Sequence, residues 1–461
     1  MKATVPSYAL PLAFLLLAFP GSLLAQQSVP ARPPSPPASS AASGRLHLRE
    51  AIALALKNNL SVRVTGTQVD ESSGTQMRQK SALEPSITTA AFANLQDRNL
   101  QALGFSLPGF MLPLTTGAFG TYDFRVFLQQ PVVDRRAYHV FQSSKRQLDA
   151  ARLTYQDTRD LIIRQAAGYY LDGQAAAAEV EAAEARVVTS RALEKLAQDQ
   201  HSAGLATGVD VLRAQVQLQR DQQTLLVDRD AYQTALLVLQ RFLGLRPGAA
   251  LELADRLEFR GISAPEIEPA LQAALEARAD YRSLRAQREA LVEQQKASRD
   301  RYLPKLSING DYGAFGRNFG QMPGVGQIQG TLTFTVFDRD RNGEQKEIAA
   351  RLQRVDVQIA DLERGIEQDL RKALLDLASA EEQVSVTQAG VDLAGSELKL
   401  SEDRFRSGVT DNIEVITAQS SLQSAQDDHI SALARHADAR MALARALGAT
   451  EQIYENYMGS K

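Results

Sequence analysis

The chain has 461 residues, with 51 Lys and Arg against 54 Asp and Glu, a formal net charge of −3, and no cysteine. The near balance of charge gives no reason to expect a nucleic acid or another polyanion as partner. The lack of cysteine excludes disulfides and a lipid-modified N-terminal cysteine, so an exported form must be stabilised by packing or assembly.

The first residues are predicted to be a secretory signal peptide over 1–25. Lys2 supplies the positive end, the segment from Leu10 to Phe19 is apolar, and a small-residue cleavage site ends at Ala25. The following segment, 26–45, is rich in Pro, Ser and Ala and is predicted to be a disordered leader.

The remainder of the chain contains an internal duplication. Pro85 recurs as Pro304, at an offset of 304 − 85 = 219, and Gly204 recurs as Gly408, at an offset of 408 − 204 = 204. A duplicated chain usually builds a pseudo-symmetric architecture. The duplication divides the chain into a first repeat (46–248), a linker or equatorial segment (249–267), a second repeat (268–448) and a C-terminal tail (449–461).

Each repeat is predicted to hold an opening helix, a β-hairpin and a long helical hairpin. No proline lies in 132–246 or in 324–461, and a proline in the interior of a helix costs about 3 kcal/mol of stability. Helices of about 69 residues, about 100 Å long, must lie in a coiled-coil-like wall. In chain order the predicted elements are a helix at 48–82, a β-hairpin at about 85–133, a helical hairpin at about 135–244, a helix at 268–302, a β-hairpin at about 304–337 and a helical hairpin at about 339–447.

The predicted strands alternate apolar and polar side chains. Tyr122, Phe124 and Val126 alternate with Asp123 and Arg125, and the second repeat has the same period. Such a strand fits either a soluble sheet or a membrane barrel with a wet interior. Export, polar faces rich in Thr, Gln and Asn, and the lack of a second covering layer favour the barrel.

Four strands per chain cannot close a barrel. An open sheet edge in lipid leaves backbone groups unsatisfied at several kcal/mol each. Three chains would give 12 strands, enough for a conduit, whereas two would give a barrel filled by its own side chains. The sequence therefore predicts a mixed α and transmembrane β fold, in which three chains share one barrel and one helical tunnel.

The chain resembles the TolC-like outer-membrane efflux channel family from about residue 46 to residue 448. The resemblance is carried by motifs that are weak singly but specific together, in order and in both repeats. These motifs are LHLREAIALALKNN at 46–59, QPVVD at 130–134, YLPKL at 302–306, VFDRDRNG at 336–343 and RFRSGVTDNIEVITAQSSL at 404–422.

The resemblance implies a homotrimer with a 12-stranded barrel and a periplasmic tunnel of 12 helices. It implies a passive exit duct of a tripartite efflux pump or type I secretion system, located in the outer membrane and contacting its lipid. A periplasmic adaptor and an inner-membrane transporter are the expected partners, and no cofactor is expected. The motifs place helix–strand junctions at Pro85, Pro131, Pro304, Asp134 and Asp338.

The resemblance places the periplasmic tip at the two glycine turns, Gly204 to Gly208 and Gly408, which are expected to dock the adaptor. Family members commonly carry acidic residues there. By motif position, Asp210 and Glu414 match them, and with Asp411 they are hypothesised to line the aperture as rings of three. The alternative is that these residues are ordinary helix N-terminal acids stabilised by the helix dipole.

This sequence departs from some members of the family at the tip. An arginine two residues after the second-repeat glycine in those members is Thr410 here, and a second aspartate is Thr417. The closing contacts of those members are therefore not expected in this chain.

No catalytic or metal-binding motif is recognised. The five histidines have no metal-ligand spacing with acids, and no nucleophile elbow, phosphate loop or zinc motif occurs. The chain is therefore expected not to be an enzyme. The alternative to the conduit is a periplasmic adaptor-type helical hairpin protein, which would need one helical hairpin rather than two.

Overall fold

The computed structural model describes residues 45–100, 102, 104, 109, 113–448, 450, 451 and 454. The predicted signal peptide, most of the predicted leader and most of the predicted C-terminal tail lie outside the described residues. The described residues belong to one compact unit.

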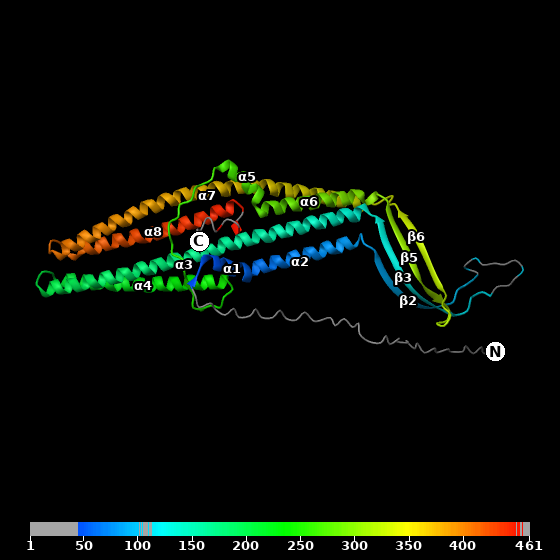
Figure 1. Ribbon diagram of the computed structural model, residues 1–461, viewed down its shortest axis with the longest axis horizontal. Helices are drawn as coiled ribbons and strands as arrows, with labels where there is room; N and C mark the ends of the chain where they lie inside the picture. Colours follow the sequence, from blue (N-terminus) through cyan, green and yellow to red (C-terminus); the bar gives the residue numbers. More distant parts are fainter. Residues whose placement is uncertain are drawn as a thin grey trace, which may run out of the picture. The chain divides into compact units, whose positions relative to one another are not determined.

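The first repeat supplies two helices, two strands and a helical hairpin, in that order (Figure 1). A two-residue strand, β1 (Arg45–Leu46), precedes them. Their bounds are α1 (Leu48–Asn58), α2 (Leu60–Ser81), β2 (Ser86–Gln96), β3 (Phe119–Val133), α3 (Arg135–Ser202) and α4 (Gly208–Phe242).

The second repeat runs through the same sequence of elements after a second two-residue strand, β4 (Glu252–Leu253). The pairing of β4 with β1 is parallel and joins the linker to the start of the first repeat. The bounds in this repeat are α5 (Ile267–Ala277), α6 (Ala279–Arg299), the 3₁₀ turn η1 (Asp300–Tyr302), β5 (Lys305–Gly316), β6 (Gly324–Thr333), α7 (Asp340–Arg406) and α8 (Asn412–Ala446).

The opening helix of each repeat is two helices, not the single one predicted. Asn59 has ψ 133° and Arg278 has ψ 120°, extended values that interrupt the helical hydrogen-bond ladder at equivalent positions. The side chain of Asn59 accepts a hydrogen bond from the backbone N–H of Ser61 at 2.8 Å and so starts a new helix. Helical periodicity continues through both breaks, which is why the sequence pattern missed them.

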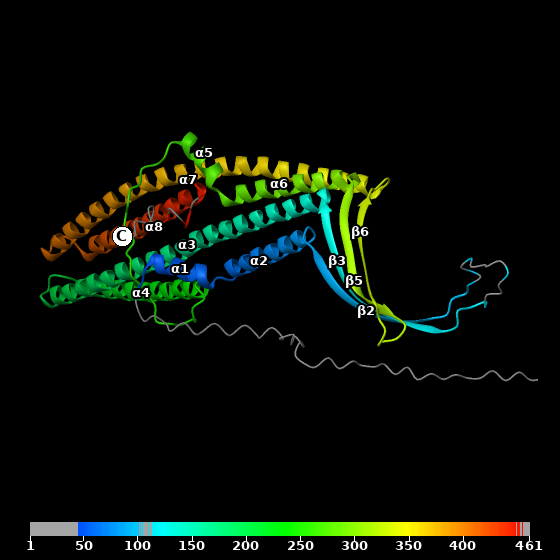
Figure 2. The same cartoon turned by 45° about the vertical axis from the view of Figure 1, so that its right-hand side comes forward.

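The four longer strands form one antiparallel sheet in the order β2-β3-β5-β6 (Figures 1 and 2). The two repeats meet at the central pair, β3 and β5, and each repeat leaves one edge strand. β6 ends at Thr333, paired with Lys305, although the alternation predicted a strand as far as Val336. On the paired strand, the residue before Lys305 is Pro304, which has no N–H to donate. Leu303 and the 3₁₀ turn η1 come before Pro304, so the hydrogen-bond ladder cannot continue.

The two longest helices, α3 and α7, have 68 and 67 residues, which corresponds to about 100 Å each. Each packs along its partner in a helical hairpin, α3 with α4 and α7 with α8, and both contact α6. The largest apolar core lies where α1 packs on α3 and includes Ile52, Ile163 and Tyr170, all at most 2% exposed. No helix among the described residues combines the length and the hydropathy that crossing a bilayer requires.

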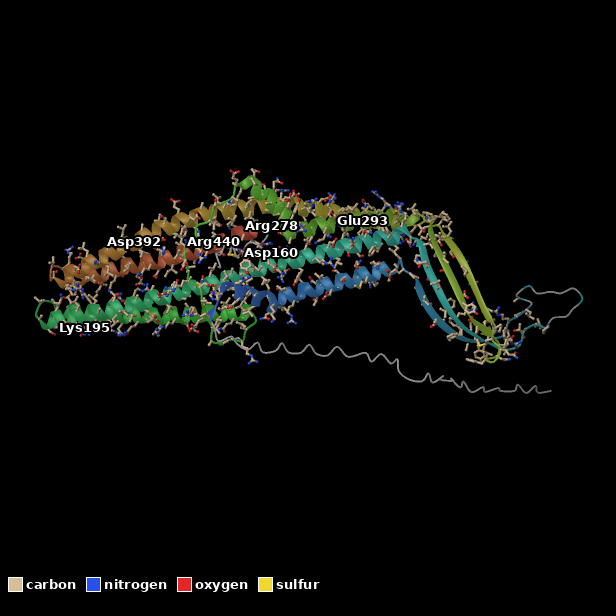
Figure 3. The ribbon with its side chains drawn as sticks, in the orientation of Figure 1. Asp160, Lys195, Arg278, Glu293, Asp392 and Arg440 are labelled. Carbon is tan, nitrogen blue, oxygen red and sulfur yellow. The ribbon has the colours of Figure 1, made fainter. Side chains whose placement is uncertain are left out.

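A glycine at the end of each helical hairpin packs against the break in the opening helices of its own repeat. Gly244 (φ +69°) lies against Asn58, and Gly448 (φ +85°) lies against Arg278, which Figure 3 labels where α5 meets α6. A Cβ on Gly448 would lie 2.7 Å from the backbone nitrogen of Arg278. Positive φ and lack of room therefore both require glycine at the end of each repeat.

The linker is fastened to the start of the first repeat by a buried tyrosine. The Tyr170 hydroxyl is within hydrogen-bond distance of a carboxylate oxygen of Asp255, at 2.7 Å, and of the carbonyl oxygen of Leu46, at 2.8 Å. The same Asp255 carboxylate accepts from the backbone N–H of Leu48 at 2.9 Å and lies 2.8 Å from the imidazole of His47. Its hydrogen bonds outweigh its partial burial, and the pKa of Asp255 lies below its ordinary value.

Candidate functional site at the helical hairpin tips

The two hairpin turns have the same backbone conformation. Gly204 and Gly408 adopt φ +76° and +69°, and in each turn two backbone hydrogen bonds close over the helix end, as in a Schellman motif. In the first turn these bonds run from Leu205 N to Gln200 O and from Gly204 N to His201 O. Gly208 is different, because it is the first residue of α4 and a helical conformation there does not require glycine.

Asp210 lies in the first turn of α4 and its side chain is almost completely covered, with 9% exposed. One carboxylate oxygen accepts from the Thr207 backbone N–H at 2.9 Å and from the Thr207 hydroxyl at 2.7 Å. This is a capping box. The other oxygen lies 3.6 Å from the guanidinium of Arg213.

The second turn also has acids at the start of its helix, but they do not form a capping box. Asp411 caps α8 by accepting from the backbone N–H of Ile413 at 3.2 Å. Glu414 accepts from Arg404 at 2.9 Å and from the Thr410 hydroxyl at 2.6 Å, and its side chain is 35% exposed. Both of these acids, like Asp210, are bonded within their own hairpin, the arrangement expected of helix N-terminal acids.

Two buried amides join the tips of the two hairpins. The side-chain amide of Asn412 donates to the carbonyl oxygen of Asp210 at 2.6 Å, and the amide of Gln200 donates to the carbonyl oxygen of Phe405 at 2.9 Å. Asn412 is fully buried and Gln200 is 8% exposed. Because their partners are backbone oxygens, the bridges depend on the position of each hairpin rather than on the identity of the residue bonded.

A small apolar cluster next to these bridges also holds the hairpins together. It is formed by buried side chains of all four long helices, namely Leu193, Ala197, Ala214, Phe405 and Val415. Separating the hairpins at the tip would expose this cluster and break both amide hydrogen bonds. The tip can therefore exist in a joined state that specific contacts stabilise.

Further along the hairpins, buried polar groups link α3, α4 and α8. Arg186 on α3 lies 3.5 Å from Asp228 on α4 and donates to Asp427 on α8 at 3.1 Å. Burial raises the pKa of Glu179, and the nearby carboxylates of Asp228 and Asp427 raise it further. One guanidinium therefore balances three acids where the hairpins meet.

The predicted junction residues lie where the helices meet the sheet. Pro85 and Pro304 immediately precede β2 and β5. Asp134 caps α3 by accepting from the backbone N–H of Ala137 at 2.8 Å. Pro131 lies in β3 beside a register shift, and Asp338 pairs with Arg301 at 2.5 Å. These residues have local structural roles and lie at the opposite end of α3 and α7 from the tips.

Asn412, Gln200 and Arg186 were not predicted from the sequence as functional residues. One signal was available for Asn412, since the offset of 204 makes it the counterpart of Gly208, where the repeats differ. Gln200 and Arg186 carry no such signal. Within the described residues, no cluster of His, Asp and Glu could hold a metal ion.

A comparison with known protein families identifies the family that has this architecture. The model of a family described as outer membrane efflux protein matches residues 51–245 and 270–449, which covers both repeats. The chain belongs to the outer membrane efflux protein family. It is accordingly a protein of the outer membrane that serves as an exit duct, and the family is not a class of enzymes.

Curated relatives agree with this assignment. The chain is 23% identical over 418 residues to the probable efflux pump outer membrane protein SepC of Pseudomonas putida, covering 87% of this chain and 83% of SepC. It is 24% identical to the pyoverdine export outer membrane protein OpmQ of the same species, over 66% of each chain.

Solved structures show the same fold. The outer membrane channel CmeC of Campylobacter jejuni aligns with a TM-score of 0.74 at 14% identity, over 90% of each chain. The open state of the MtrE channel of Neisseria gonorrhoeae aligns with a TM-score of 0.72 at 17% identity, over 87% of this chain and 89% of MtrE.

Proposed function

We propose that three copies of this chain form a continuous duct, with a 12-stranded barrel in the outer membrane and a helical tunnel in the periplasm. The duct is passive and takes its cargo from an inner-membrane transporter through a periplasmic adaptor. The curated relatives named as efflux pump components support the pump rather than a type I secretion system. Because the family model matches both repeats, the adaptor-type alternative is set aside.

The observation that carries the proposal is the exposure of the apolar side chains of the sheet. Phe124 is 53% exposed, Tyr312 73% and Ile328 86%, and the strand register puts all three on one face. A soluble sheet would cover such a face with a second layer, whereas a membrane barrel turns it to lipid.

The edges of the sheet support three copies. β2 and β6 each have one unpaired edge, and unpaired backbone groups in lipid cost several kcal/mol each. Pairing β6 of one copy with β2 of the next removes every edge when the ring closes. With four strands per copy, three copies reach 12 strands, enough to leave an open interior.

The hairpin tips are proposed to form the periplasmic aperture, with Gly204, Gly208 and Gly408 at the surface that meets the adaptor. The joined tips, held by Asn412 and Gln200, correspond to the resting state. Among the three candidate acids, Asp210 is covered, whereas Asp411 is exposed and the Glu414 side chain is 35% exposed, so these two are available to a permeating ion. Three copies of Glu414 would form a ring that favours cations.

The cargo is proposed to be organic molecules of low molecular weight. Relatives in Pseudomonas putida are named as a toluene efflux pump outer membrane protein and as an antibiotic efflux pump outer membrane protein. A passive duct has no chemistry of its own, so cargo is selected mainly by the transporter that loads it.

The absence of native cysteine makes ring closure directly testable. Thr88→Cys on β2 and Gln329→Cys on β6 place one thiol near each sheet edge, on the same face by register. A bis-maleimide added to outer membranes should yield covalent dimers and trimers from the double variant only. Crosslinking no stronger than in the single variants, or recovery of the protein outside the outer-membrane fraction, would contradict the proposal.

A further inference from the structure

The four long strands contain four charged residues, and three of them meet. The fourth is Lys305, at the very start of β5, where it lies 3.5 Å from Asp134. Asp123 and Arg125 of β3 and Asp311 of β5 form the group that we call the strand charge cluster. They are close to the middle of their strands.

The strand register brings the cluster together on one face. Asp123 and Arg125 are two residues apart, so their side chains leave the same side of β3. Arg125 lies opposite Gly313, which makes Asp311 its diagonal neighbour on that side. The guanidinium donates to Asp123 at 2.7 Å and to Asp311 at 3.0 Å.

The cluster lies on the face opposite Phe124, Tyr312 and Ile328. Val126 and Tyr312 pair across the strands on the apolar face, while Arg125 and Asp311 alternate with them. The Asp311 side chain is 6% exposed and that of Arg125 25%, although no second layer of described residues covers this face (Figure 1). The cluster is shielded by its own ion pairs and by Phe315, whose ring centre lies 5.9 Å from the guanidinium.

Gly313 keeps the position opposite Arg125 free of a side chain. A Cβ there would lie 2.0 Å from the carbonyl oxygen of Phe124 and 2.6 Å from the Cα of Arg125. Glycine is therefore the only residue type that fits this position, because the β3 backbone and the Arg125 side chain occupy the place that a Cβ would take.

Charges at the depth of the bilayer centre are costly, and where they occur they usually face a water-filled path and serve the passage of solutes. One Arg and two Asp give the cluster a net charge of −1 per chain. In an open barrel of three chains, three such clusters lie at one level.

We propose that the strand charge cluster is a charge filter of the barrel, which favours cationic over anionic solutes and whose strength is limited by Arg125. The inference rests on the proposed trimeric barrel. Arg125 holds the two carboxylates in place and offsets one of them, so its removal exposes a stronger negative site.

The test is the reversal potential of purified protein in planar bilayers under a KCl gradient. Arg125→Gln should raise the ratio of K⁺ to Cl⁻ permeability, by up to about fivefold, the effect of one unit charge about 4 Å from an ion in water. Asp123→Asn combined with Asp311→Asn should lower the ratio and favour Cl⁻. Lys305→Gln, at the strand end, is the matched control and should change it little.

Two further variants separate charge from folding. Arg125→Lys keeps the charge and should keep the selectivity, and the exchange of Arg125→Asp with Asp311→Arg keeps both the pairing and the net charge. Unchanged selectivity in Arg125→Gln and in the Asn double variant, with channels still formed, would overturn the filter. If the wild-type protein formed no channels, the proposed function would fail instead. If the neutralised variants do not assemble, the selectivity of the exchange variant is the test. An exchange variant that assembles but has altered selectivity would also overturn the filter.

Discussion

The side-chain amide of Asn412 lies 2.6 Å from the carbonyl oxygen of Asp210, a residue 202 positions earlier in the sequence. This bond joins the tips of the two helical hairpins. The bond is buried and crosses between repeats. In the first repeat the position equivalent to Asn412 is Gly208, which has no side chain to form a reciprocal bond. The contact is therefore asymmetric although the repeats are pseudo-symmetric.

Replacing Asn412 should loosen the tip. Asn412→Ala removes the amide donor and leaves a buried carbonyl oxygen without this partner, at a cost of about 1 kcal/mol. In planar bilayers, the variant should show a higher conductance, or more frequent openings, than the wild-type protein.

The control for this variant is Ser202→Ala, which removes a hydrogen bond made only within α3, to Gln198. Its conductance should equal that of the wild-type protein. Equal conductance in Asn412→Ala would show that the bridge does not hold the tip closed.

Changes at Glu414 and Arg404 should have opposite effects on ion selectivity. Glu414→Ala removes a carboxylate from the proposed aperture and should reduce the preference for cations. Arg404→Ala frees that carboxylate from its 2.9 Å partner and should increase the preference. Reversal potentials in a salt gradient measure both, and unchanged conductance and selectivity in Glu414→Ala would exclude the ring of glutamates.

The stability of the protein should depend on the protonation of Asp160, which Figure 3 labels on α3. Burial raises the pKa of this carboxyl to about 6, although the backbone N–H of Glu451 donates to it at 2.9 Å. Because the folded state binds the proton more tightly than the unfolded chain, Asp160 stabilises the fold fully below about pH 4. This contribution is lost as the pH rises through 6.

Asp160→Asn keeps an acceptor oxygen without the charge, so it should raise the thermal midpoint at pH 8 and change it little at pH 4. The difference between the two pH values corresponds to at most about 3 kcal/mol. Asp361→Asn, on the exposed surface of α7, is the control and should have no pH-dependent effect. A midpoint for Asp160→Asn that differs from wild type equally at both pH values would contradict the raised pKa.

The same substitution should act in opposite directions at two glycines of the second repeat. Gly448→Ala forces a side chain into positive φ and into the backbone of Arg278, and should lower stability by about 2 kcal/mol or more. Gly395→Ala lies within α7 with nothing within 4 Å of the added Cβ, and should raise stability by up to about 1 kcal/mol. Thermal unfolding of the detergent-solubilised protein measures both, and equal shifts would refute the packing argument.

Removing one hydroxyl should release the linker. Tyr170→Phe deletes the group that contacts Asp255 and the Leu46 carbonyl, at a cost of about 1–3 kcal/mol. Limited proteolysis should then cleave more readily between 254 and 266. Tyr169→Phe, which loses only a hydrogen bond to Gln165 on the same helix, is the matched control. Equal cleavage rates in the two variants would show that the hydroxyl does not fasten the linker.

Several elements could be read from the sequence because their causes are local. Proline-free, Ala-rich tracts and glycine turns gave the two long helical hairpins, and alternation gave the strand pairs. The breaks at Asn59 and Arg278 could not be read, because helical periodicity continues across them and the packing of Gly244 and Gly448 accompanies each break. The early end of β6 could not be read either, because it depends on the lack of an N–H donor at Pro304, which precedes the neighbouring strand.

At the tip, sequence position identified the acids but not their partners. Asp210 and Glu414 were matched by motif position and Asp411 was added as a hypothesis, and each is bonded within its own hairpin. The bridges of Asn412 and Gln200 run to backbone oxygens of the other repeat, and a backbone acceptor leaves no trace in residue identity.

By itself, the sequence determined the duplication, the membership of an outer-membrane efflux family and the types of its elements, because periodicity, glycine and proline act over a few residues. Only the tertiary structure decided which groups meet across the repeats: Asn412 with Asp210 at the tip, Arg125 with Asp311 in the sheet, and Gly448 with Arg278 between them. Those meetings depend on helix packing and strand register, which place residues close in space whose separation in sequence carries no signal.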